Sequence, residues 1–212
     1  MAAHASDPRF LVIHGLRLKG FAEGEAVAAM TGLSTADIEP VLKELGEAEL
    51  AKRREGRVSG WALTPAGRDQ HAALVADELG AAGARDVVDG CYHRFLDVNQ
   101  EMLAVCTAWQ LREDQGAQAL NDHSDAAYDN AVIERLASID ERVQPVCDDL
   151  AGALERFTRY GARLTDALEK VRSGDHEWFT KPVIDSYHTV WFELHEDLLT
   201  TLGIERASEG QG

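Results

Sequence analysis

The segment over residues 31–68 constrains the fold of this chain more than any other. A turn at residues 31–34 ends in Ser34, a residue type that favours the N-cap of a helix. Apolar residues then recur at steps of four and three, which is the spacing of one buried helix face. They are Ile38, Leu42 and Leu45. We therefore expect a helix that begins at Ser34 and packs on one side.

A β-hairpin rich in basic residues is expected next. Short strands around residues 50–54 and 58–63 flank a turn at Glu55 and Gly56, and the Thr64–Pro65 pair then opens another helix. Residues 51–68 contain five bases and a single acid. A helix followed by a basic hairpin is typical of a winged helix-turn-helix, which reads nucleic acid.

Two more helices are expected before this segment. Asp7 followed by Pro8 is a strong helix start signal, and Gly20 closes the helix that it opens. A second helix is expected over residues 23–30, with Gly32 supplying the left-handed residue of its C-terminal turn. These elements complete an N-terminal winged helix-turn-helix domain over residues 1–80, with a two-stranded wing.

This part of the chain resembles the MarR-type winged-helix repressors. The resemblance covers roughly residues 8–78 and is moderately specific. It is carried by Leu33–Ser34, the spacing of Ile38, Leu42 and Leu45, the basic hairpin, and the run from Leu63 to Arg68. It implies a dimeric, ligand-responsive transcription factor. The helix from Ser34 would lie in the major groove, and the wing would contact the DNA backbone or the minor groove.

The expected DNA-contacting residues lie on the outward face of the third helix and on the hairpin. They are Ser34, Thr35, Ala36, Glu39, Lys43, Lys52, Arg53, Arg54, Arg57 and Ser59. Glu39 is unfavourable opposite a phosphate, although it can accept a hydrogen bond from a cytosine amine. Pro40 removes one helix hydrogen bond. Double-stranded DNA is the expected partner, and a winged helix that binds only another protein is the alternative.

The charge distribution sets the basic hairpin apart from the rest of the chain. The 212 residues carry a net charge of −16. The net charge is −3 over residues 1–80 and −13 over residues 81–212. Such an acidic remainder would repel phosphates and confine DNA to the hairpin face. The alternative is that the acidic residues only confer solubility.

Residues 81–212 are expected to form an all-helical domain for dimerisation and effector sensing, so the chain is expected to be mainly α-helical. A helix over residues 85–111 has apolar residues in alternating steps of three and four, which form a heptad seam. They are Val88, Cys91, Phe95, Val98, Met102, Val105 and Trp109. The seam requires a partner helix from the same bundle or from a second subunit, and its aromatic residues favour the bundle.

The rest of this domain is expected to contain a polar loop and shorter helices. The loop is expected over residues 112–122, followed by a helix over 125–143 that Pro145 breaks or kinks before a helical continuation. Two more helices are expected over residues 162–172 and from about residue 182 to Gly203. No strand pattern follows residue 63.

Histidines and aromatic residues near the C-terminus are candidates for a ligand pocket. The candidate residues are His123, Asp185, His188, Trp191 and His195. Spacing places the last four on one face of the final helix, together with Phe192 and Leu199. A buried, hydrogen-bonded core is the alternative interpretation. A metal site is a poorer fit, because His188 and His195 are two helical turns apart, roughly 10 Å.

Motifs of catalysis and membrane insertion are not found in the sequence. A phosphate loop, a nucleophile elbow and a His-Glu-x-x-His motif are missing, so neither an enzyme nor a cofactor is expected. An enzyme or metal sensor acting through Asp185, His188 and His195 is a further alternative. No apolar run approaches the roughly 20 residues that span a bilayer. The three cysteines fit reduced core thiols, and we expect a cytoplasmic homodimer that responds to a small-molecule effector.

Overall fold

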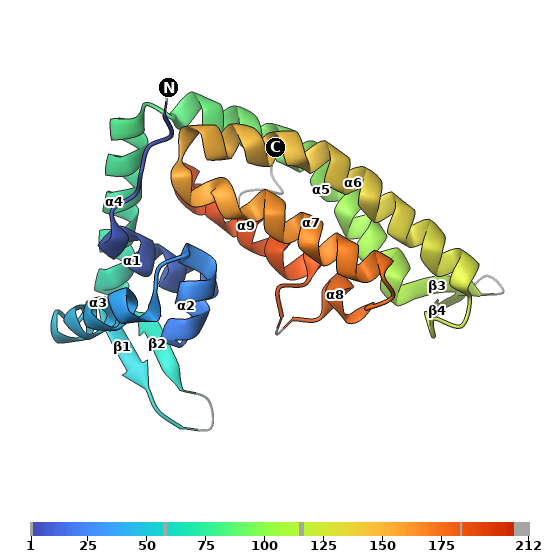
Figure 1. Cartoon of the computed structure of the whole chain (residues 1–212), viewed down its shortest axis with the longest axis horizontal. Coiled ribbons are helices and arrows are strands. Elements are labelled where there is room, and N and C mark those ends of the chain that lie inside the picture. Colours follow the sequence, from blue (N-terminus) through green and yellow to red (C-terminus); the bar gives the residue numbers. More distant parts are fainter. Residues whose placement is uncertain (1, 57–58, 115–116, 183, 206–212) are drawn as a thin grey trace. The chain divides into compact units, whose positions relative to one another are not determined.

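The computed structural model describes residues 2–56, 59–114, 117–182 and 184–205, and these residues are mainly helical (Figure 1). The helices are α1 (Pro8–Lys19), α2 (Gly24–Thr31), α3 (Thr35–Glu47), α4 (Pro65–Ala82), α5 (Arg85–Gln110), α6 (Ala126–Ala153), α7 (Thr158–Arg172), α8 (Glu177–Thr180) and α9 (Tyr187–Leu202), with a 3-10 turn η1 (Glu155–Phe157). The strands are β1 (Ala51–Arg54), β2 (Gly60–Leu63), β3 (Leu111–Asp114) and β4 (Ala117–Leu120).

The chain forms two compact units that are not contiguous in sequence. Unit 1 contains Met1–Val88, Ala151–Phe157 and His195–Gly212, and unit 2 contains Asp89–Leu150 and Thr158–Leu194. The sequence interpretation divided the chain once, after residue 80. The structure instead assigns two later segments to the same unit as the N-terminal helices, because α6 and α9 each contribute residues to both units.

The helices of unit 1 begin where capping residues occur in the sequence. The Asp7 carboxylate accepts hydrogen bonds from the amides of Arg9 (2.9 Å) and Phe10 (3.2 Å) at the start of α1. Thr64 caps α4 by accepting from the Gly67 amide at 3.1 Å. These bonds satisfy amides that have no partner within the helix. The predicted starts of both helices are confirmed.

The core of unit 1 joins its first three helices to the β1–β2 hairpin. Its buried members are Val12, Ile13, Leu16, Ala22, Val27, Ile38, Leu42, Leu45, Ala51 and Leu63. Ala22, between α1 and α2, also exchanges two backbone hydrogen bonds with Trp61 in β2, at 2.7 and 3.0 Å. The hairpin is therefore fixed to the helices by both apolar packing and backbone bonding.

Helix α5, most of which belongs to unit 2, carries a continuous buried stripe, as the heptad seam predicted. The seven residues from Val88 to Trp109 at these positions are all buried. Phe95 contacts Trp191 of α9 (ring centroids 4.7 Å apart), and Trp109 stacks on Phe179 of α8 at 4.4 Å. The partner helices of the seam within unit 2 thus come from the same chain, which was the favoured interpretation.

Helices α5 and α6 of unit 2 run antiparallel beside each other (Figure 1). Ion pairs join Arg94 to Asp149 (2.7 Å) and Arg142 to Glu101 (2.5 Å), so residue numbers rise along one helix as they fall along the other. Helix α6 continues through Pro145, where the sequence suggested a break. Pro145 is exposed, so water can satisfy the carbonyl that loses its amide partner.

The expectation of an all-helical second domain is wrong, because β3 and β4 form an antiparallel hairpin where a polar loop was predicted. Leu111 pairs with Leu120, and the Asn121 amide donates to the Gln110 carbonyl at 2.8 Å, closing the open end of the hairpin. The Tyr128 hydroxyl donates to the Ala108 carbonyl at 2.9 Å. The strands are only four residues long and lack alternating apolar residues, so the sequence carried no strand signal.

The final helix buries a face that only partly matches the one assigned from sequence, because Trp191, His195 and Leu199 are buried as expected but His188 and Phe192 are not. Its buried stripe contains Tyr187, Val190, Trp191, Leu194 and Leu198. His188 is exposed and Phe192 is 46% exposed, although both were expected to point inward. Burying Tyr187 and Val190 removes their apolar surface from water, whereas the polar His188 stays at the surface.

Two features of the whole chain complete the description. Among the described residues, no helix is both long and apolar enough to cross a membrane. The three cysteines are free thiols. Burial raises the pKa of Cys147 to about 12 and that of Cys106 to about 11, which keeps both thiols protonated at neutral pH.

Candidate nucleic-acid interface

Helix α3 presents small and polar side chains to solvent at its N-terminal end. Ser34, Thr35, Ala36, Glu39 and Lys43 are all exposed. Ser34 caps the helix, since its hydroxyl accepts from the Asp37 amide at 3.2 Å and donates to the Asp37 carboxylate at 2.5 Å. The short side chains of this first turn allow a large ligand to approach the helix closely.

Two carboxylates of α3 are engaged within the protein. Glu44 pairs with Arg9 of α1 at 2.9 Å. The Glu39 carboxylate lies so close over Gly24 that a Cβ atom there would clash with it. Gly24 begins α2, where the unpaired amides of a helix start favour a negative charge. This contact gives Glu39 a role at the start of α2 that the sequence did not reveal.

The β1–β2 hairpin carries its basic residues on two different faces, because side chains alternate along a strand. Arg53 points to the face that also contains its cross-strand partner Trp61, whose ring lies 5.9 Å from the guanidinium carbon. Arg53 also approaches Glu55 at 3.5 Å and Glu23 at 3.8 Å. Its charge is therefore largely balanced within unit 1.

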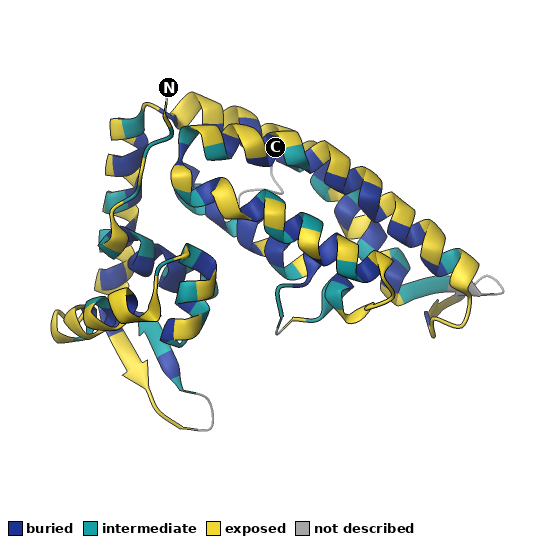
Figure 2. Cartoon of the chain, viewed as in Figure 1, coloured by how far each residue is buried: buried dark blue, intermediate teal, exposed yellow. Residues whose placement is uncertain are grey.

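Lys52 and Arg54 project from the opposite face of β1. Their cross-strand partners are Ala62 and Gly60, which add little or no side chain to that face. Both basic residues are exposed, and Figure 2 shows β1 exposed along most of its length. Neither side chain makes a hydrogen bond or ion pair with any residue that the structure describes.

Arg57 and Ser59 are the remaining two residues of the hairpin that were expected to contact DNA. Arg57 lies outside the described residues. Ser59 is half-buried beside the buried Gly60 at the start of β2. Of the expected hairpin residues, Lys52 and Arg54 are thus the two described cations available to a ligand.

The five residues proposed as a ligand pocket do not form one site. Asp185 pairs with Arg163 at 3.0 Å, and the Trp191 indole donates to Asn99 at 2.9 Å. His188 is exposed. His123 contacts the buried Asp129. Four of the five residues therefore have separate environments and do not line one pocket, in contrast to the expectation from helical spacing.

The Arg163 pair illustrates how unit 2 satisfies its buried charges. Arg163 also donates to Glu193 at 2.6 Å. Burial alone would lower the pKa of the Arg163 guanidinium, but Glu193 and Asp185 raise it above its usual value. The cluster connects α7 to α9 through one guanidinium that bonds two carboxylates.

Sequence reasoning missed a buried polar cluster in unit 1. It contains His14, His71, Glu78, Arg156 and Asp197. Arg156 donates to Glu78 at 2.9 Å and also to Asp197, while His14 contacts Asp197 at 3.1 Å. These residues come from α1, α4, η1 and α9, so the cluster holds the two later segments of unit 1 to its N-terminal helices.

His71 is the residue of this cluster with the most altered acidity. Its ring nitrogen lies 2.9 Å from that of His14, and its ring stacks on Phe10. Burial, followed by the charge of His14, lowers the pKa of His71 to about 3. The imidazole is therefore neutral at physiological pH and acts as a structural hydrogen-bonding group.

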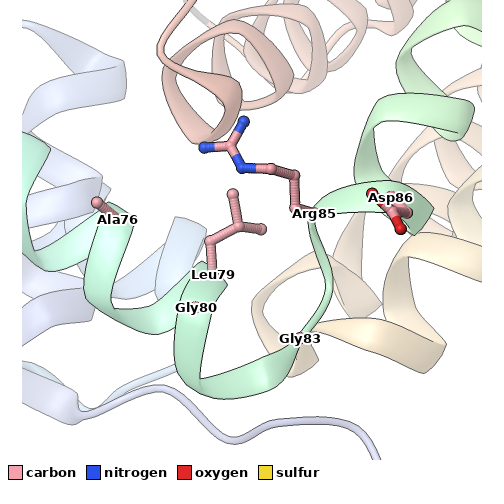
Figure 3. Close-up of a pocket in the computed structure, with 6 residues that line it drawn as sticks. All are labelled: Ala76, Leu79, Gly80, Gly83, Arg85 and Asp86. Atoms are coloured by element: carbon pink, nitrogen blue, oxygen red, sulfur yellow. The ribbon is translucent and has the colours of Figure 1, made fainter.

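Concave or metal-binding sites are not prominent among the described residues. No group of three or more His, Cys, Asp or Glu side chains gathers there in a way that could hold a metal ion. A shallow pocket of about 270 Å³ lies where α4 meets α5, with Leu79 on one wall and the Arg85 guanidinium beside it (Figure 3). Gly80 and Gly83 also line it, with open space around both residues.

Comparisons with known proteins do not identify this chain. No family model, curated protein or solved structure matches it.

Proposed function

We propose that this protein is a DNA-binding transcriptional regulator whose N-terminal region is a winged helix-turn-helix. The order α1–α2–α3–β1–β2–α4 supports the proposal. So does the bonding of Ala22 to Trp61, because it adds the segment between α1 and α2 to the hairpin as a third, very short strand. In such a fold α2 and α3 form the helix-turn-helix and the hairpin is the wing.

The observation that carries the proposal is that Lys52 and Arg54, both exposed on one face of β1, make no ion pair with the residues that the structure describes. Lys52 and Arg54 are two residues apart in a strand, which separates their Cα atoms by about 7 Å. Successive phosphates of a nucleic-acid strand can be contacted by cations at such a spacing. The chain has 37 acidic and 21 basic residues, yet no described carboxylate pairs with these two cations. Both charges are therefore available to a polyanionic ligand.

Helix α3 would supply the base contacts. Thr35 and Ala36 are exposed in its first turn, and methyl groups of this kind contact the thymine methyl in the major groove. Lys43 lies two turns further along the same helix. In this arrangement the hairpin provides most of the phosphate contacts, and α3 provides the sequence preference.

Selection of genomic fragments with the purified protein, followed by fluorescence anisotropy on a selected duplex, tests the proposal. The double variant Lys52→Ala/Arg54→Ala should weaken binding to every duplex at least tenfold, because both phosphate contacts are lost. Arg53→Ala is the matched control, since it removes one charge from the same strand but from the face balanced by Glu23 and Glu55. It should change the affinity less than threefold.

Two results would overturn the proposal. One is failure to enrich any fragment at low salt. The other is a double variant that binds as tightly as wild type while the control variant loses affinity, because DNA would then contact a different face.

A protein-binding winged helix is the second candidate, and the composition of α3 favours it. The helix contains Asp37, Glu39, Glu44 and Glu47 against a single base, and Pro40 is exposed on it. A protein partner would tolerate these acids better than a phosphate backbone does. Enrichment of a protein partner that depends on α3, without any DNA binding, would select this candidate.

The proposed regulator would work as a cytoplasmic homodimer on a two-fold symmetric DNA site. A small-molecule effector remains part of the proposal, but the five residues suggested for it from sequence do not meet in one site. Light scattering of the purified protein would show whether the chain is dimeric.

A further inference from the structure

An aromatic and histidine cluster lies in unit 2 next to the β3–β4 hairpin, and the proposed DNA binding makes no use of it. Trp109 is at its centre and is buried, with Phe179 stacked on one side at 4.4 Å. His123 approaches the same indole at 4.4 Å, and His176 meets it edge-on at 5.2 Å. Both imidazoles are exposed. Two histidines thus flank one tryptophan at the protein surface.

The ring of His123 is oriented by buried polar groups. Its Nδ1 atom lies 3.0 Å from Oδ2 of Asp129, whose side chain is 4% exposed. Asn121 fixes this carboxylate by donating to its other oxygen at 2.8 Å. His123 also has a left-handed backbone with φ of 58°, which is uncommon for a residue with a side chain. The Asp129 contact occupies one ring nitrogen and leaves Nε2 available.

A histidine whose Nδ1 is held by a carboxylate is the usual arrangement of a metal ligand. The carboxylate fixes the tautomer and makes the opposite nitrogen a better donor. The second imidazole, His176, makes no hydrogen bond through its ring to a described residue. It occupies the N-cap position of α8, and its side chain makes no capping hydrogen bond.

The separation of the two rings constrains the kind of ion. Their centroids are 6.4 Å apart. A ring nitrogen lies about 1.1 Å from its centroid and binds a metal at about 2.1 Å, so two imidazoles on one ion have centroids at most about 6.4 Å apart. That limit corresponds to ligands on opposite sides of the ion. A tetrahedral ion would need centroids about 5.2 Å apart.

We propose that His123 and His176 form a binding site for a divalent transition-metal ion of the tetragonal class, such as Cu²⁺. Imidazole suits this ion, and tetragonal geometry accepts two nitrogens on opposite sides. Among the described residues no group of three His, Cys, Asp or Glu side chains could hold a metal ion, so in this proposal water fills the other coordination positions. Asp129 is the positioning residue of the site.

Titration of Cu²⁺ into the full-length protein, followed by tryptophan fluorescence, tests the site. A paramagnetic ion between the two imidazoles would quench Trp109 in a saturable way at one equivalent. Subtracting the titration of a Trp109→Phe variant isolates that signal from the other tryptophans. His123→Ala and His176→Ala should each weaken the Trp109 response at least tenfold. His93→Ala, an exposed histidine of the same unit, is the matched control and should leave it unchanged.

Asp129→Asn tests the positioning role. It keeps the side-chain shape but replaces the carboxylate, so metal affinity should fall 10–100-fold. Circular dichroism of each variant establishes that it folds. The site is refuted if Trp109 shows no saturable quenching in folded wild-type protein. It is equally refuted if His123→Ala and His176→Ala, both folded, quench as wild type does.

Discussion

Lowering the pH from 7 to 5 is expected to destabilise unit 1 by about 2 kcal/mol through His71 alone. The pKa of His71 is about 3 in the folded protein, compared with the usual 6.5. Between these values the unfolded chain binds a proton at this residue and the folded chain does not. Because the unfolded state takes up more protons, stability is full above pH 6.5 and falls as the pH drops toward 3.

The magnitude follows from the distance between the two pKa values. Each pH unit below 6.5 favours the unfolded state by about 1.36 kcal/mol, so 1.5 units give about 2 kcal/mol at pH 5. His71 is 2% exposed, and therefore solvent does little to offset this cost. Protonation there would also place a second charge beside His14 and the Arg156 guanidinium.

Urea unfolding at pH 7 and pH 5 measures this loss, with His71→Gln as the test variant. The glutamine can keep a hydrogen bond to His14 but cannot titrate, so its loss of stability between the two pH values should be smaller by about 2 kcal/mol. His93→Gln, at an exposed position in unit 2, controls for the removal of a histidine and should behave as wild type. An NMR titration in which His71 protonates near pH 6.5 would refute the reasoning, as would equal pH dependence of wild type and His71→Gln.

Two more substitutions test the packing. Arg156→Ala should cost about 3–5 kcal/mol because it removes the guanidinium that pairs with the buried carboxylates of Glu78 and Asp197. Arg142→Ala, which breaks an exposed pair, should cost at most about 1 kcal/mol in the same denaturation assay. Met102→Glu should unfold unit 2 by placing an unpaired charge in the core. Leu103→Glu is the control, because this neighbouring position is 55% exposed, and it should leave the circular dichroism unchanged. A folded Met102→Glu protein would contradict the buried position of α5.

Local signals explain why most helices could be predicted from the sequence. Asp7, Ser34 and Thr64 bond the first amides of their helices as capping residues do. The steps of three and four along α5 place its apolar side chains in the core. Each of these features is set by neighbours within a few residues, so the sequence carries the information directly.

The polar sites depend on contacts between distant residues and could not be predicted in the same way. Arg156 and Glu78 are 78 residues apart, and neither is unusual among the many charged residues of the chain. Helical spacing put His188 in the core, yet it is Tyr187 that is fully buried. The rotation of α9 is decided by the helices that it packs against, and those partners are not encoded in its own periodicity.

The basic hairpin also combines features that its own sequence predicts with a feature that depends on a residue outside it. The strands predicted around residues 50–54 and 58–63 occur as Ala51–Arg54 and Gly60–Leu63, and the excess of positive charge was also evident from the sequence. Arg53 differs from Lys52 and Arg54 in that Glu23, which precedes α2 and lies outside the hairpin, partly balances its charge. A count of charges within the hairpin could not show which arginine is already paired.

The salt dependence of DNA affinity is the measurement that tests the central claim most directly. For a duplex selected from genomic fragments, log K should fall linearly with log salt concentration in wild-type protein. The slope should become shallower by about 1.8 in Lys52→Ala/Arg54→Ala, at about 0.9 for each lost phosphate contact, and should be nearly unchanged in Arg53→Ala. A slope that is identical in wild type and the double variant would contradict the claim that this face of the hairpin binds DNA.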